Sequence, residues 1–88
     1  MVTGKTESGF EFELKKEALD DYELVEVLHK IDKGEFGLVP EMVERLLGEE
    51  QKEKLKEHVR DENGKVSASR LLDEVMQIFR ANKETKNL

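Results

Sequence analysis

The chain has 88 residues, 41% of them charged, with 21 acidic residues against 15 basic ones and a net charge of −6. That length predicts one domain with a small core. The acidic balance argues against nucleic acid or an anionic membrane as a partner, because both need lysine and arginine to neutralise phosphates. No apolar run approaches the roughly 18 residues of a membrane span, and the absence of cysteine excludes disulfides and thiol chemistry.

Residues 1–14 have the pattern of a β-hairpin. Phe10, Phe12 and Leu14 alternate with glutamates, as in a strand with one buried face. Ser8-Gly9 before them is a turn signal, so the residues that precede the turn form the first arm. Because a lone hairpin is marginal in water, we expect its aromatic face to lie on helices.

The clearest helix start signal opens residues 20–32, which we predict to be the central helix. A short connection with one helical turn precedes it. Asp20 and Glu23 have the spacing of a capping box, in which side-chain oxygens accept hydrogen bonds from free backbone N–H groups. At about 100° per residue, one face of this helix is apolar and predicted to be buried. Its members are Leu24, Val27, Leu28 and Ile31.

A second apolar strip flanks that face. Tyr22, Val25 and His29 form the strip, and Phe36 and Leu38 lie in the short loop that follows the helix. Two explanations stay open for these five residues. They lie beneath the aromatic residues of the hairpin, or they form an exposed patch that binds another protein, as such patches on small proteins commonly do. They are our candidate protein-binding residues.

Three further helices are predicted over residues 40–47, 49–60 and 67–81. Pro40 suits the first turn of the earliest of them, and Gly48 ends it. The last helix has the best amphipathic pattern in the second half of the chain. Its apolar residues are Leu71, Leu72, Val75, Met76 and Phe79.

Residues 82–88 show no periodicity and are predicted to be a disordered tail, which leaves residues 1–81 as a single domain. The predicted fold class is mainly α (α+β). It consists of a short N-terminal β-hairpin, residues 1–14, followed by a compact bundle of about four short helices.

Residues 61–67 resemble the second half of a calcium-binding EF-hand loop, with Gly64 at the sharp turn. If Gly64 takes the sixth loop position, Val59 takes the first and Arg70 the twelfth. Calcium needs carboxylates at both positions. We therefore interpret the segment as a turn followed by a helix cap.

The sequence contains no motif for metal binding, cofactor binding or catalysis. His29 and His58 lie far apart in the chain and belong to no metal-ligand pattern. There is no Gly-x-Ser-x-Gly elbow and no glycine-rich phosphate loop. A domain this small has little room for the low-dielectric pocket that tunes paired carboxylates. We therefore predict a protein without enzymatic activity, cofactor or metal.

Charge is distributed unevenly along the chain. Residues 1–50 hold 14 acidic and 6 basic residues, a balance of −8, whereas residues 51–88 hold 7 acidic and 9 basic residues, a balance of +2. Solvated helix faces are one explanation. The other is that the two halves of neighbouring copies attract each other head to tail and form oligomers.

Four segments have the order and spacing found in a known protein family. They are SGFEF at residues 8–12, EALDDYEL at 17–24, LLGEEQ at 46–51 and RDENGKV at 60–66. Over roughly residues 8 to 80 the chain resembles the small tail assembly chaperones of siphophages and their prophages.

The resemblance implies a small, acidic, mainly helical protein of the host bacterial cytoplasm that is absent from the mature virion. Proteins of that family bind the hydrophobic tape measure protein, keep it soluble during tail assembly and recruit the tail tube protein. Many are also made in a longer form by a translational frameshift. An alternative also fits the residues: a small regulatory or adaptor domain, with a degenerate EF-hand-like loop, that binds a partner helix.

Overall fold

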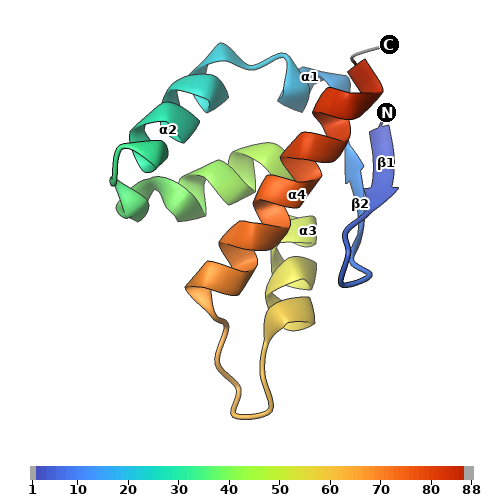
Figure 1. Cartoon of the computed structure of the whole chain (residues 1–88), viewed down its shortest axis with the longest axis vertical. Coiled ribbons are helices and arrows are strands. Elements are labelled where there is room, and N and C mark those ends of the chain that lie inside the picture. The colour runs from blue at the N-terminus through green and yellow to red at the C-terminus, as the bar shows by residue number, and fades with distance from the viewer. Residues whose placement is uncertain (1, 87–88) are drawn as a thin grey trace.

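The computed structural model describes the backbone of residues 2–86 and the side chains of residues 2–80. An N-terminal hairpin is followed by helices, which confirms the predicted fold class (Figure 1). The elements in chain order are β1 (Val2–Lys5), β2 (Glu11–Leu14), α1 (Lys16–Leu19), α2 (Tyr22–Asp32), the 3-10 helix η1 (Phe36–Leu38), α3 (Val39–Val59) and α4 (Ala68–Lys86). Within the described backbone, no helix combines the length and the apolar character that crossing a membrane requires.

The hairpin forms as its alternation predicts. Strands β1 and β2 pair antiparallel, with Gly4 opposite Phe12, and the three apolar residues from Phe10 to Leu14 are buried. A Cβ on Gly4 would lie 2.6 Å from the ring of Phe12. The missing side chain therefore makes room for that ring, which explains why a glycine, normally unfavourable inside a strand, lies in the first arm of the hairpin.

Helix α2 begins one residue later than the capping-box pattern predicts. Asp21, not Asp20, is the N-cap, and its Oδ1 accepts a 3.2 Å hydrogen bond from the N–H of Leu24. Asp20 instead ends α1, where its own N–H donates to the carbonyl of Lys16. Because the helical turn α1 ends at Asp20, the next residue, Asp21, becomes the cap of α2.

The two helices predicted over residues 40–47 and 49–60 are the two halves of α3. Gly48 separates them with φ 81° and ψ 163°, a backbone conformation outside the helical region. Figure 1 shows the halves running in different directions, with the second half beside the start of α4. After Gly48, the Gln51 side chain accepts from the N–H of Glu13 at 2.7 Å and donates to its carbonyl at 2.7 Å. These bonds attach the outer edge of β2 to α3.

The segment between α3 and α4 is a tight turn, as the sequence predicts. The Asp61 carboxylate accepts hydrogen bonds from the N–H groups of Asn63 and Lys65, both at 2.9 Å. Ser67 caps α4, since its Oγ accepts from the N–H of Arg70 at 3.3 Å.

Helix α4 continues beyond its predicted end at residue 81. The tail expected to be disordered, residues 82–88, is helical as far as Lys86, and residues 87 and 88 lie outside the described residues. No glycine or proline interrupts the sequence from Ala68 to Lys86, so no local signal stops the helix.

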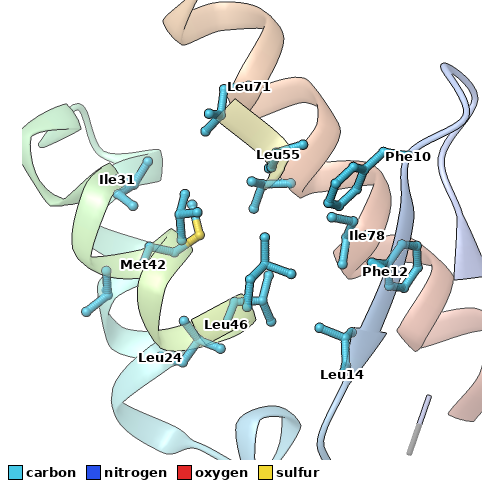
Figure 2. Close-up of a cluster of buried hydrophobic side chains, with 14 of the residues drawn as sticks. Phe10, Phe12, Leu14, Leu24, Ile31, Met42, Leu46, Leu55, Leu71 and Ile78 are labelled. Carbon is cyan, nitrogen blue, oxygen red and sulfur yellow. The ribbon is translucent and has the colours of Figure 1, made fainter. Parts of the chain in front are cut away.

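The core joins the hairpin to α2, α3 and α4 (Figure 2). On α2, Leu24, Val27 and Ile31 are buried as predicted, whereas Leu28 is only partly buried. The largest fully buried side chains are Leu14, Leu24, Met42, Leu55, Ile78, Val43 and Val75. Of these, the predicted stripe on the last helix omits Ile78.

Candidate protein-binding groove

An apolar groove of about 560 Å³ lies between α2, η1 and α4. Eight of its ten lining residues are apolar, and only His29 and Asp32 are polar. The lining consists of Val25, Leu28, His29, Ile31, Asp32, Phe36, Met42, Leu72, Met76 and Phe79.

The groove arises because two helices each carry more apolar residues than one buried face can use. On α2, the residues one position after the buried ones, Val25 and Leu28, line the groove, where Val25 is exposed and Leu28 is partly buried against the core. On α4, Leu71, Val75 and Ile78 are buried in the core. Their neighbours at the same helical spacing face the groove, and these are Leu72, Met76 and Phe79.

Four large apolar side chains are exposed among residues 2–80: Tyr22 at 74%, Phe36 at 64%, Val25 at 53% and Met76 at 38%. Three of the four line the groove. Tyr22 is three residues before Val25 on α2 and lies on the same side of the helix. The hairpin therefore does not cover the Tyr22, Val25 and His29 strip, which excludes the first of the two explanations that the sequence left open.

The structure brings three of the five candidate residues, Val25, His29 and Phe36, into the groove lining. Tyr22 is outside the lining, and Leu38 is partly buried against the core. The α4 wall was not predicted to be a binding surface. The signal was present as two interleaved apolar sets on one helix, of which only one can face the core.

An ion pair fixes the start of α2 against α3. The Arg45 guanidinium lies 3.0 Å from the Asp21 carboxylate and 3.6 Å from that of Glu23. The hydrogen bond from Arg45 holds the pKa of Asp21 below its ordinary value, and the same bond raises the pKa of Arg45. One end of the groove's α2 wall is therefore attached to the core helix.

A polar cluster around the buried carboxylate of Glu74 attaches the hairpin turn to the far side of α4. The Glu74 carboxylate, 6% exposed, accepts hydrogen bonds from the hydroxyls of Thr6 at 2.6 Å and Ser8 at 2.8 Å. The Ser8 Oγ lies 2.9 Å from His58 Nε2. Because the single Ser8 proton goes to Glu74, the imidazole must donate to the serine. These bonds link the hairpin turn to α4 and to the end of α3.

Among the side chains of residues 2–80, no group of three or more histidines, aspartates or glutamates is placed to hold a metal ion. We found no protein-family model that matches the chain, and no significant match among curated proteins or solved structures.

Proposed function

We propose that this protein is a non-enzymatic assembly chaperone that holds an apolar segment of a partner protein in the groove. The observation that supports this proposal is the exposure of Val25, Phe36 and Met76 together in one concave surface. The free chain gains no stability from leaving such side chains in water. Covering them recovers about 25 cal/mol for each Å² of apolar surface removed from solvent.

The tape measure protein is the proposed partner, and the tail tube protein the proposed second partner. The resemblance of residues 8 to 80 to siphophage tail assembly chaperones supports this choice. On the same ground, the proposed place of action is the host bacterial cytoplasm, with the protein absent from the mature virion. The physical character of the chain agrees with the role, because an acidic exterior with a net charge of −6 keeps a complex with a hydrophobic partner in solution.

Co-expression with the tape measure protein encoded nearby tests the proposal. The wild-type chain should raise the soluble fraction of the tape measure protein and co-purify with it. The Val25→Glu, Met76→Glu double variant should lose both effects, because it places two carboxylates in the groove.

A matched control adds the same two charges elsewhere. Asn63 and Ser69 are exposed and lie outside the groove lining, so the Asn63→Glu, Ser69→Glu double variant should behave like the wild type. Failure of the wild-type chain to co-purify with the tape measure protein or to raise its solubility would contradict the proposal.

The groove also suits the alternative, an adaptor domain that binds one partner helix. Oligomeric state separates the two functions, because several chaperone copies act along one long partner. Light scattering at increasing protein concentration should show growing oligomers for the chaperone and a strict monomer for the adaptor.

A further inference from the structure

We infer that the groove binds a short amphipathic helix with lysine or arginine beside its apolar residues. The inference rests on the proposed function, because it assigns a secondary structure and a charge to the segment bound there. Three properties of the groove support it. Its walls are helices, the two walls are equally long, and its α2 side is negatively charged.

The walls of the groove favour a helix over an extended segment. Val25 and Leu28 belong to α2, and Leu72 and Met76 to α4. Backbone groups in the middle of a helix are already hydrogen-bonded within it. An extended segment would therefore bury backbone N–H and C=O groups without partners, at a cost for each group. A helix satisfies its own backbone and offers only side chains.

Both walls have the same length. The lining on α2 runs from Val25 to Asp32 and on α4 from Leu72 to Phe79. In each wall the last lining residue follows the first at i+7, a distance of about 10 Å at 1.5 Å per residue. That length matches two turns of a bound helix, with apolar residues at positions i, i+3 or i+4, and i+7.

Methionine makes the lining adaptable. Two of the three methionines of the chain line the groove, Met42 fully buried at its base and Met76 exposed in its wall. An unbranched, polarizable side chain adjusts to different apolar partners. The groove therefore selects for the spacing of apolar residues more than for one residue type.

The charge near the groove is negative on its α2 side. Asp32 is the one carboxylate in the lining, and among residues 2–80 it has no ion-pair partner. Residues 20–38 hold six acidic and two basic residues, a balance of −4, whereas residues 68–80 hold two of each and are neutral. A helix with cations on the flank that faces α2 therefore complements the groove.

Three synthetic peptides of equal length, labelled with fluorescein, test the inference by anisotropy with the full chain. Each is long enough for about five helical turns. The first has leucines at the helical spacing and lysines on its flanks. The second replaces the lysines with glutamates. The third has the composition of the first, rearranged so that leucine and lysine alternate as in a strand.

We expect the lysine-flanked helical peptide to bind at least fivefold more tightly than the glutamate-flanked one at low salt, with the ratio falling as salt rises. The strand-patterned peptide should bind at least tenfold more weakly than the first. Equal affinity for the two helical peptides would overturn the charge assignment, and equal affinity for the two lysine peptides would overturn the helix assignment.

Variants show whether the peptides occupy the groove. Asp32→Asn should reduce the preference for lysine, whereas Asp73→Asn, which removes an exposed charge outside the lining, should not. Val25→Ser with Met76→Ser should weaken binding of the lysine helix without changing the charge of the protein. Unchanged affinity in that double variant would overturn the inference, because binding would then be non-specific attraction to an acidic protein.

The peptide experiment can refute this inference without refuting the proposed function, and the reverse also holds. If the tape measure protein co-purifies through the groove and the glutamate-flanked peptide binds as well as the lysine-flanked one, the charge inference is wrong and the chaperone proposal stands. If the lysine helix binds with dependence on Asp32 and the tape measure protein does not co-purify, the groove inference stands and the partner is another protein.

Discussion

The hydroxyl of Thr6 donates a 2.6 Å hydrogen bond to the buried carboxylate of Glu74, 68 residues further along the chain. This bond holds the hairpin turn on α4, and the ring of Phe10 lies 5.4 Å from that of His58 at the end of α3. The aromatic face of the hairpin thus packs against α3 and α4. The second apolar strip of α2 is left uncovered, and the groove stays open.

Replacing Thr6 by valine should destabilise the fold by about 1–3 kcal/mol, because the buried Glu74 carboxylate loses a donor while the side-chain volume is kept. The N–H of Phe10 also loses its bond to the Thr6 hydroxyl. Urea unfolding followed by circular dichroism measures the loss. Thr3→Val, at an exposed position of the same hairpin, is the control and should change stability by less than about 0.5 kcal/mol. Similar values for the two variants would show that the bond to Glu74 contributes little.

Gly48→Ala should destabilise the fold by about 1–3 kcal/mol through backbone strain alone. Gly48 has a φ of +81°, which side-chain-bearing residues rarely adopt, and an added Cβ would have no atom within 4 Å. A Cβ added to Gly37 would also lie in open space, but Gly37 has no positive φ. Gly37→Ala therefore isolates the conformational effect, and thermal unfolding should show little change for it. A neutral Gly48→Ala variant would mean that α3 can straighten at this point.

The ion pair of Asp21 with Arg45 should make stability depend on pH. The hydrogen bond from Arg45 lowers the pKa of Asp21 in the folded chain. The resulting stabilisation is complete above the ordinary carboxyl pKa of about 4 and is lost as the pH falls through the lowered value. Arg45→Gln should therefore lower the urea midpoint at neutral pH and have a smaller effect in acid, at about pH 2.

Arg70→Gln is the control for this pH dependence, since Arg70 is exposed and has no ion pair among the described side chains. Its effect should be small at both pH values. A loss in Arg45→Gln that is the same in acid as at neutral pH would assign the effect to packing of the arginine side chain.

Much of the fold follows from local patterns in the sequence. Phe10, Phe12 and Leu14 alternate because one face of the strand is buried, and Gly48 breaks a helix that has Pro40 in its first turn. The choice between Asp20 and Asp21 as the cap of α2 could not be predicted in the same way. Both residues satisfy the local rule, and the end of α1 decides between them.

Only one of the two helical walls of the groove, the α2 wall, could be predicted from the sequence. The surplus of apolar residues on α2 is visible in the sequence, and Val25, His29 and Phe36 follow from it. The opposite wall belongs to α4, in the other half of the chain, and its apolar residues look like one stripe until Ile78 is known to be buried. Packing of α4 on the core separates that stripe into an inner and an outer set.

The most direct test of the account is an NMR titration of the methionine methyl groups. Protein labelled with ¹³C at methionine and uniformly with ¹⁵N is mixed with soluble fragments of the tape measure protein, the proposed partner, and the Met76 signal is assigned from a Met76→Leu variant. If the groove is the binding surface, the Met76 signal shifts saturably with added partner, while the amide of Ser8 on the hairpin turn keeps its position. A partner that binds while the Met76 signal stays unchanged and the Ser8 amide shifts would contradict the account.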